Sequence, residues 1–577
     1  MNCAIMNPGR VLNPAREVIF PAFPFNFTKN FFTTLKYFAN LPKKGKRVPN
    51  VLRTLITYKK KVNGMAHPEI VKYVAEHDVL TADLSQVKVF DGTIQSGIYL
   101  SSFQKKGDAL FCTCRDDAAK TKYAAMIAAS ADACPQFPGS PEQEGELFIA
   151  TSGLTHELAL FLRKEFPFTI PVSLKGKDAT IGTGDRLGLA NPAHIRAVRD
   201  YDIFPVLAQQ SIRELNFTKR TYQEVVDAAT FAAFQEGYED GFGFDGDHLK
   251  TLDEINMALD CEATMITLDL SEVMNAKAAN WSDEQLLEGY QSLSADEKLR
   301  LESTYLGETF TMQDGTTLSF DETELHRCSV MYLEAIAFAK EVYDLLVSRR
   351  GEGNFDFEMS IDETEAPTVP QHHLFIIKEL IHNGVVVESL APRFIGEFQK
   401  AIDYIGDLDE FEKQFNVHCQ IAKTYGNYKV SVHSGSDKFS AYPAIGKWTE
   451  GRLHVKTAGT SWLEAVRVIA LKEPELYREI HQLAFDSVDE ALKFYHITAD
   501  FSKIAALDSV SDADLPEYLN RPESRQLIHI IYGFVMQDDS LRQRFYDALF
   551  VHEELHYQLL RDHIRKHVTL LGRPKKA

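Results

Sequence analysis

The feature that most constrains the fold is a rhythm of short apolar runs, each followed by a stretch with helical periodicity. Such alternation is typical of βα units, whose strands form a parallel sheet, and eight units are enough to close a barrel. We therefore expect an α/β chain whose residues 177–490 form a (β/α)8 TIM-like barrel. The eight runs cover residues 179–184, 204–210, 241–245, 263–269, 355–362, 385–390, 428–434 and 452–458.

Smaller segments precede and follow this barrel. Residues 65–176 contain alternating apolar positions that predict antiparallel strands, together with a helix expected from Asp117 to Asp132. We expect this segment to form a small α+β lead-in. After the eighth run the sequence is helical to its end, so residues 491–577 are expected to form a helical cap over the barrel.

The gap between the fourth and fifth runs is much longer than the other gaps. A helical insertion is expected at about residues 271–322, where Ser282 and Ser294 are candidate N-caps of two helices. The fourth barrel helix would then extend from Thr323 to Arg349.

The charge balance changes sharply at Met65. Residues 1–64 contain twelve Lys or Arg and one acid, Glu17, whereas the rest of the chain contains 50 basic and 81 acidic residues. The basic segment is either a targeting arm or a disordered or spurious extension upstream of a natural start at Met65. We favour the extension, because periodic and balanced sequence begins only at that methionine.

Composition also limits the partners and the compartment. An acidic body does not favour binding to nucleic acid or to anionic membranes. Seven scattered cysteines are typical of a reduced, cytosolic chain, and no apolar run is long enough to span a membrane. We expect a cytoplasmic protein with a small-molecule partner, and the sequence leaves homo-oligomerisation open.

Polar side chains gather at the carboxyl ends of the predicted strands, where the active sites of such barrels lie. The period of two in the fifth and seventh runs turns Glu358, Asp362 and His433 toward the barrel axis. Asp185 and Asp362 could instead be helix N-caps. Two histidines and several acids suit a divalent ion such as zinc, manganese, nickel or cobalt. The other members of the set are Arg186, Asp245, Asp247, His248 and Asp269.

Two glycine-bearing loops follow the last two runs, at residues 433–439 and 456–462. Loops in these positions often bind phosphate through backbone N–H groups. With Lys438 and Lys456 beside them, we expect an anion site, for either a phosphate or a carboxylate. Lys456 could instead be a solvated residue at the rim.

Two further motifs do not support a function. The segment from His552 to His556 matches the H-E-x-x-H signature of zinc proteases, but no glutamate follows Glu554 to act as a third ligand. We expect it to lie on a surface helix or a helix that packs in the cap. No G-x-G-x-x-G fingerprint follows a predicted strand, so we expect no bound NAD.

Six motifs between about Gly182 and His496 are distinctive: GTGDRLGLANPAHIRAV, PVLAQQSIREL, FQEGY, DGDHLKT, SVHSGSDKFSAYP and HVKTAGTSWLEAVRV. Together they resemble the bacterial tagaturonate epimerase family. The resemblance implies a metal-dependent enzyme that interconverts D-tagaturonate and D-fructuronate in hexuronate catabolism. It implies Asp247 as the proton acceptor and Glu358 as the proton donor. It also implies metal ligands, His248 and His433, and substrate-pocket residues, Ser211 and Thr267. Asp185 and Arg186 lie in the first motif and are added to the candidate substrate-binding residues.

The third metal ligand stays open among Asp269, Asp362 and Glu388. Two other functions also stay open. One is a metal-dependent phosphosugar aldolase or isomerase on the same barrel, and the other is a non-catalytic protein that binds sugar acids. Activity on unphosphorylated hexuronates would separate the first from the epimerase.

The chemistry of the implied reaction narrows the mechanism. The two hexulosonates differ at a carbon β to the ketone, so the carbonyl does not acidify the hydrogen on that carbon. Transient oxidation by NAD is disfavoured by the missing fingerprint. Retro-aldol cleavage, rotation of the aldehyde and re-addition suit a Lewis-acidic metal, with Asp247 and Glu358 dividing the proton transfers. We expect apolar walls to raise the pKa of Glu358, and Lys438 and Lys456 to hold the substrate carboxylate.

Overall fold

A closed barrel of eight parallel strands forms the centre of the protein. The structure, a computed structural model, describes residues 67–144, 146–364 and 366–576, so the expected extension at 1–64 lies outside the described residues. The fold class predicted from the eight runs is confirmed. In order around the barrel the strands are β8 (Ala179–Gly182), β9 (Phe204–Gln210), β10 (Gly243–Leu249), β11 (Met265–Asp269), β14 (Asp356–Ile361), β15 (Ser389–Pro392), β16 (Lys429–Val432) and β17 (Leu453–Lys456).

The period of two along β14 determines what faces the barrel axis. Glu358 pairs in register with Thr267 of β11 and Ser389 of β15. The side chain of the preceding residue, Phe357, points the opposite way and packs against Tyr343 of a surrounding helix. Alternate residues therefore point into the barrel and out to the helices, as expected for a strand.

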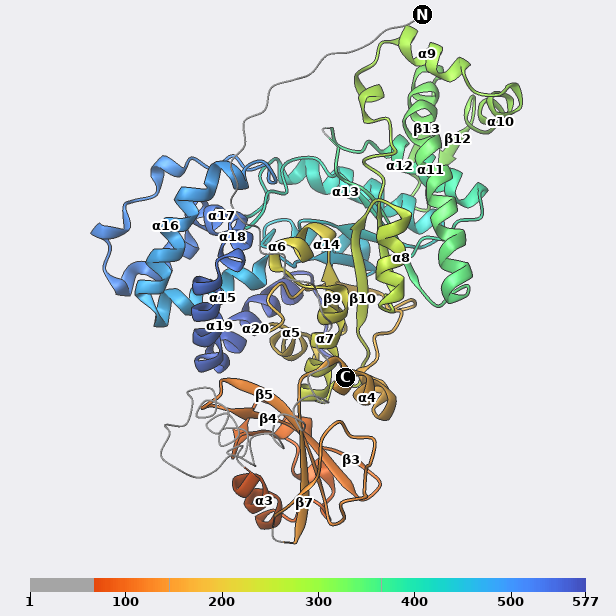
Figure 1. Ribbon diagram of the computed structural model, residues 1–577. Helices are drawn as coiled ribbons and strands as arrows, with labels where there is room; N and C mark the ends of the chain where they lie inside the picture. Colours follow the sequence, from red (N-terminus) through yellow and green to blue (C-terminus); the bar gives the residue numbers. More distant parts are fainter. Residues whose placement is uncertain (1–66, 145, 365, 577) are drawn as a thin grey trace, which may run out of the picture. The chain divides into compact units, whose positions relative to one another are not determined.

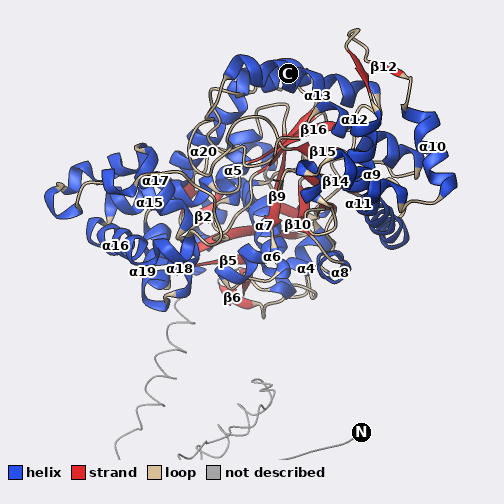
Figure 2. Cartoon of the chain, turned by 90° about the horizontal axis from the view of Figure 1, so that it is seen from above, coloured by secondary structure: helices blue, strands red, loops and turns tan. Residues whose placement is uncertain are grey.

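Helices surround the barrel strands, as Figure 2 shows. The helix expected after the fourth strand, from Thr323 to Arg349, is present with one further residue at each end. Many begin with a side-chain cap; Thr251, for example, accepts a hydrogen bond from the N–H of Glu254. They are α5 (Asn191–Val198), α6 (Ile212–Thr218), α7 (Tyr222–Glu236), α8 (Leu252–Asp260), α11 (Glu322–Arg350), α12 (Pro370–His382), α13 (Leu408–Thr424), α14 (Tyr442–Thr449) and α15 (Thr460–Lys472).

An antiparallel sheet precedes the barrel, with two helices beside it, α3 (His67–Glu76) and α4 (His156–Glu165) (Figure 1). The strand order is β1-β2-β4-β5-β7-β6, and β3 pairs with β4. The strands are β1 (Ile94–Gln95), β2 (Ile98–Tyr99), β3 (Gln104–Lys106), β4 (Ala109–Asp116), β5 (Thr121–Ala128), β6 (Glu142–Glu144) and β7 (Leu147–Gly153).

The helix expected from Asp117 to Asp132 is wrong, because β5 occupies that segment. Both faces of β5 are buried, by separate hydrophobic clusters. Tyr123, Ala125 and Ile127 belong to one cluster, and Ala124 and Met126 belong to the other. A strand buried on both faces has a continuous apolar sequence, which the alternation rule cannot separate from a helix.

The insertion after β11 contains the two expected helices, α9 (Asp283–Gln291) and α10 (Ala295–Tyr305). Ser282 and Ser294 cap them as predicted, since each side chain accepts a backbone N–H of the first turn. A short turn, η4 (Ala276–Asn280), precedes α9. A hairpin that we did not predict follows the pair and consists of β12 (Thr309–Thr311) and β13 (Thr317–Ser319).

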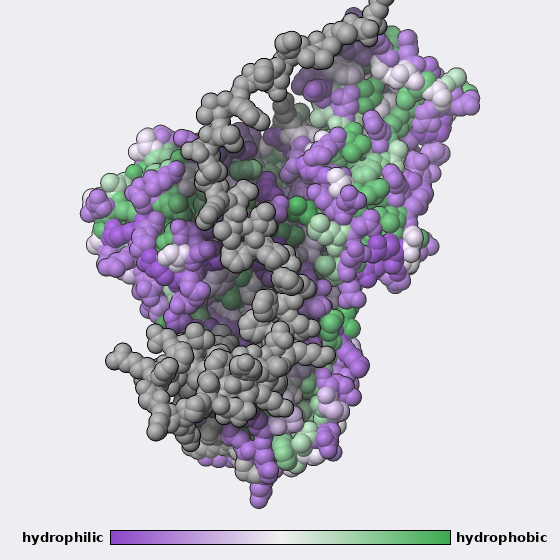
Figure 3. Space-filling view, viewed as in Figure 1, coloured by the Kyte–Doolittle hydropathy of each residue, from purple (hydrophilic) through white to green (hydrophobic). Residues whose placement is uncertain are grey.

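The chain after β17 is helical and builds a second hydrophobic cluster around Trp462. Figure 3 shows largely hydrophilic side chains where these helices are visible, at the left of the view. None of the described helices is both long and apolar enough to cross a bilayer. The elements are α16 (Pro474–Ala491), η5 (Phe501–Lys503), η6 (Leu507–Ser509), η7 (Asp512–Asn520), α17 (Pro522–Ile530), α18 (Tyr532–Gln537), α19 (Asp539–Val551) and α20 (Glu553–Leu570).

The protease-like segment from His552 to His556 has a packing role in this fold. His552 precedes α20, so the segment does not lie within one helix as a zinc-protease motif requires. Glu553 is buried and forms an ion pair with Lys122 of β5, and it accepts a hydrogen bond from Tyr99 of β2 at 2.5 Å. The motif therefore attaches the C-terminal helix to the antiparallel sheet.

Candidate active site

Many polar side chains line a cavity of about 530 Å³ at the carboxyl ends of the barrel strands. Its walls include Asp247 and His248 from β10, His433 from the end of β16, and Lys456 from β17. The C-terminal helices contribute His529. The parallel strands thus bring residues more than 200 positions apart into one cavity.

Lys456 lies at the centre of an acidic cluster on the barrel axis. Its Nζ atom is 2.6 Å from Asp247 Oδ1, 2.9 Å from Glu358 Oε1 and 3.1 Å from Asp245 Oδ2. It also donates a hydrogen bond to Thr267 Oγ1 at 2.6 Å, and Thr267 donates to Asp245. All five side chains are buried. One ammonium group thus bridges three carboxylates from two strands, β10 and β14.

Attraction to neighbouring positive charges affects the pKa values of these carboxylates more than burial does. Burial opposes the ionisation of Asp247, but Lys456 and then His248 lower its pKa to about 2. Burial also opposes the ionisation of Glu358, yet Lys456 and the neighbouring histidines hold its pKa well below the ordinary value. The expected rise in the pKa of Glu358 is wrong, because the groups around it are charged and polar rather than apolar.

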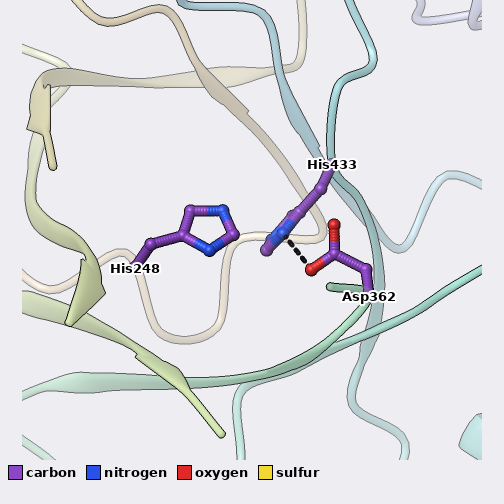
Figure 4. A group of neighbouring side chains, drawn as sticks. All are labelled: His248, Asp362 and His433. Atoms are coloured by element: carbon purple, nitrogen blue, oxygen red, sulfur yellow. Dashed lines mark hydrogen bonds and ion pairs between the residues drawn. The ribbon is translucent and has the colours of Figure 1, made fainter. Parts of the chain in front are cut away.

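His248, Asp362 and His433 form the group best suited to a metal ion. Figure 4 shows the two imidazole rings and the carboxylate turned toward one another, and one donor atom from each lies within 4.8 Å of the others. His433 Nδ1 is 3.0 Å from Asp362 Oδ1, and His433 Nε2 is 2.8 Å from Glu358 Oε1. Burial disfavours a charged ring at His433, but Asp362, together with Glu358, raises its pKa to about 10.

These residues suit a divalent cation in two respects, the types of their donor atoms and the negative charge of the nearby carboxylates. Two imidazole nitrogens and a carboxylate oxygen are common ligands of zinc and other transition metals. Carboxylates that stabilise a protonated His433 would equally stabilise a metal ion bound at this ring.

The local backbone turns His248 toward this group. Its φ of 52° lies in the left-handed region, which non-glycine residues seldom adopt. The pairing of β10 with β11 shifts register between Gly246 and Leu249, so His248 lies in a bulge. Bulges beside active sites commonly change the direction of one side chain.

The structure separates the three candidates for a third ligand. Asp362 is the candidate that lies close to both histidines. Asp269 Oδ2 is 3.4 Å from His248 Nδ1 and belongs to an adjoining group with Glu363. Glu388 precedes β15 and forms an ion pair with Lys429 at the opposite end of the barrel, so it cannot reach the histidines.

The two lysines expected to hold a carboxylate are not free to do so in the structure. Lys438 is buried outside the cavity, and its Nζ donates to three backbone carbonyls, those of Gln399, Ile402 and Ser436, at 2.7–2.8 Å. It therefore joins two loops. Lys456 does line the cavity, but the carboxylates around it would repel a substrate carboxylate. These contacts favour neither lysine as the group that holds the substrate carboxylate.

Of the remaining predicted residues, some line the cavity and others make contacts that support the surrounding structure. Asp185 accepts four backbone N–H groups, those of residues 187, 188, 190 and 191, so it fixes the turn before α5, although the N-cap position itself is Ala190. Arg186 lines the cavity and its Nη2 lies 2.5 Å from Glu214 Oε1. Ser211 lines the cavity too and caps α6. Thr267 lies within the Lys456 cluster on the axis.

The cavity residues that were not predicted include Arg213, Lys400, Phe494 and His529. Arg213 lies two positions after Ser211, so the motif that contains both could have indicated it. The other three lie in the loop after β15, in the turn after α16 and in α17, away from any strand end. A search confined to strand ends could not find them.

Comparison with known proteins gives matches over most of the chain. A family model described as tagaturonate epimerase matches residues 99–571. The tagaturonate/fructuronate epimerase of Thermotoga maritima is 41% identical over 490 residues, which is 84% of this chain and 99% of that protein. The native crystal structure of the fructuronate-tagaturonate epimerase of Cohnella laeviribosi is 43% identical, with a TM-score of 0.78. The match covers 83% of this chain and 96% of that chain, as it does for a glycerol complex of the same epimerase.

Proposed function

The chain belongs to the tagaturonate epimerase family, and from this premise we propose that it interconverts D-tagaturonate and D-fructuronate with a divalent metal ion. The observation that carries the proposal is that two groups of side chains lie next to each other at the carboxyl ends of the barrel strands. The His248–Asp362–His433 group suits a metal, and Asp247 and Glu358 flank Lys456 beside it. Relatives that this chain matches over nearly their whole length are named for this reaction.

We further propose that the reaction proceeds by cleavage and re-formation of a carbon–carbon bond. The inverted carbon bears a hydroxyl group and lies β to the ketone. When this hydroxyl loses its proton, its oxygen electrons form an aldehyde carbonyl, and the carbon–carbon bond pair moves onto the ketone as an enediolate. The aldehyde then turns over and the enediolate attacks its other face. No atom is gained or lost, and the metal would supply Lewis acidity toward the substrate oxygens.

The residues of the Lys456 cluster would handle the proton. Asp247, ionised and buried, accepts the hydroxyl proton on one face. Lys456 lies 2.6 Å from Asp247 and 2.9 Å from Glu358, so it can pass a proton between the two carboxylates. Glu358 then returns the proton to the new alkoxide, which makes it a donor despite its low resting pKa.

Removal of the metal tests this function. Chelation should abolish the conversion of tagaturonate, and one added divalent ion should restore it, because the proposed cleavage needs a Lewis acid. Product formation would be followed by NMR on metal-replete and metal-stripped protein. Full activity without metal would contradict the metal dependence, and no conversion under any metal would contradict the substrate assignment.

A further inference from the structure

One wall of the cavity carries more positive charge than its neighbours neutralise. Arg186, Arg213 and Lys400 all line it. Arg186 forms an ion pair with Glu214. Within the part of the chain that the structure describes, Arg213 donates to a backbone carbonyl and Lys400 to a hydroxyl, and neither has an ion-pair partner. Glu363 and Asp362 attract Arg213 and Lys400 only from a distance, without an ion pair. Cations that lack an ion-pair partner are unfavourable in a partly buried wall unless an anion joins them.

Arg186 is the cation of this wall whose hydrogen-bond donors are least satisfied. The residue is only 5% exposed, and its guanidinium lies over the ring of Tyr532 at 4.3 Å. Glu214 occupies Nη2, but Nε and Nη1 have no hydrogen-bond partner among the described residues. The same holds for both ring nitrogens of His529, which lines the same cavity. Buried donors without a partner mark a place that a ligand can fill.

Lys400 connects this wall to the metal group. Its Nζ donates to Ser434 Oγ at 2.7 Å, and Ser434 directly follows His433. Burial, and then repulsion from Arg213 and Arg186, lowers the pKa of Lys400. A bound anion would relieve that repulsion. The acids around Lys456 would repel the same anion from the barrel axis, so a charged substrate has one favourable orientation.

We propose that Arg186, Arg213 and Lys400 bind the carboxylate of the sugar acid, an assignment that rests on the proposed epimerase function. Bond cleavage leaves this carboxylate on a three-carbon aldehyde fragment, because the bond that breaks lies on the ketone side of the inverted carbon. While the cations hold the carboxylate, the aldehyde group can rotate about the adjacent bond and present its other face. The wall thus selects acids over neutral sugars and retains the fragment between cleavage and re-addition.

Ligand binding tests the assignment without turnover. The probes are D-gluconate, an acid that lacks the ketone, and D-glucitol, its uncharged counterpart, titrated calorimetrically into the metal-loaded protein. Arg213→Met and Lys400→Met should each weaken gluconate binding about 10- to 100-fold and leave glucitol binding nearly unchanged, as expected for a lost charge-assisted hydrogen bond. Lys219→Met removes a positive charge at the end of α6, outside the cavity, and should change neither. Arg186→Lys keeps the charge near Glu214 and should lose less than the other two.

Each outcome decides the question. The assignment is overturned if the variants lose gluconate no more than Lys219→Met does, or lose both probes equally. Tighter binding of D-glucitol 6-phosphate, lost in the same variants, would instead make the wall a phosphate site. Conversion of tagaturonate by the unaltered protein is measured separately. If the protein converts tagaturonate but the binding pattern fails, only the carboxylate assignment fails. If the binding pattern holds without conversion, the cavity binds sugar acids and the proposed reaction is wrong.

Discussion

Replacing Glu358 with glutamine is expected to lower kcat by about 10²- to 10⁴-fold while metal stays bound, because the amide keeps the shape of the side chain but cannot carry the proton. Glu358 accepts a hydrogen bond from Ser389 at 2.5 Å, and its other carboxylate oxygen lies 3.2 Å from Thr267 Oγ1. The amide oxygen can keep one such bond, so the barrel should stay folded. The measurement is kcat for tagaturonate together with metal content and melting temperature.

Asp356→Asn is a matched control for this variant. Asp356 is a buried acid on the same strand, but it lies at the amino end of β14 and binds Ser173 and the N–H of Leu174. Its replacement removes a buried carboxylate without touching the cavity, so kcat should change little even if stability falls. A normal kcat for Glu358→Gln, or an equal loss in Asp356→Asn, would contradict a proton-transfer role for Glu358.

Replacing His433 with alanine is expected to remove the metal and with it essentially all turnover. The imidazole is the member of the metal group that contacts Asp362 directly, and it also orients Glu358. Loss of a ligand from a three-residue site leaves too few donors to hold a divalent ion tightly. Metal content by elemental analysis and kcat would be measured on the same preparation.

His372→Ala separates this site from another group with metal-binding residue types. His372 lies near Glu324 and Cys328, away from the cavity, and its Nδ1 is 2.8 Å from Tyr332 Oη. We expect this variant to keep its metal and its activity. If His372→Ala lost the metal and His433→Ala kept it, the metal site would be misplaced.

The barrel could be predicted from sequence because the strand runs are short, apolar and separated by helices. The start of a strand was harder to predict where apolar residues lie just before the first residue that pairs with a neighbouring strand. The run expected at 385–390 becomes a strand at Ser389–Pro392. Val386 in that run is 53% exposed, and regular bonding to β14 begins with the N–H of Glu388. Hydrophobicity alone does not show where a ladder of hydrogen bonds starts.

The site was predictable to the extent that it lies at strand ends. Asp247, His248, Glu358 and His433 meet because eight parallel strands end at one face. Their protonation could not be predicted, since the pKa of Glu358 depends on Lys456 from a strand nearly 100 residues away. The roles of the lysines were also hidden. A lysine in a glycine-bearing loop can point to substrate, to carboxylates or to backbone carbonyls, and only tertiary contacts decide.

The central claim, inversion by breaking and re-forming a carbon–carbon bond, is tested most directly by turnover of tagaturonate in D2O. The hydrogen on the inverted carbon stays attached throughout retro-aldol chemistry, whereas direct deprotonation exchanges it with solvent. NMR and mass analysis of the product should therefore show fructuronate with no deuterium at the inverted carbon. Deuterium at that carbon would contradict the account and would mean that Asp247 and Glu358 act on carbon rather than on oxygen.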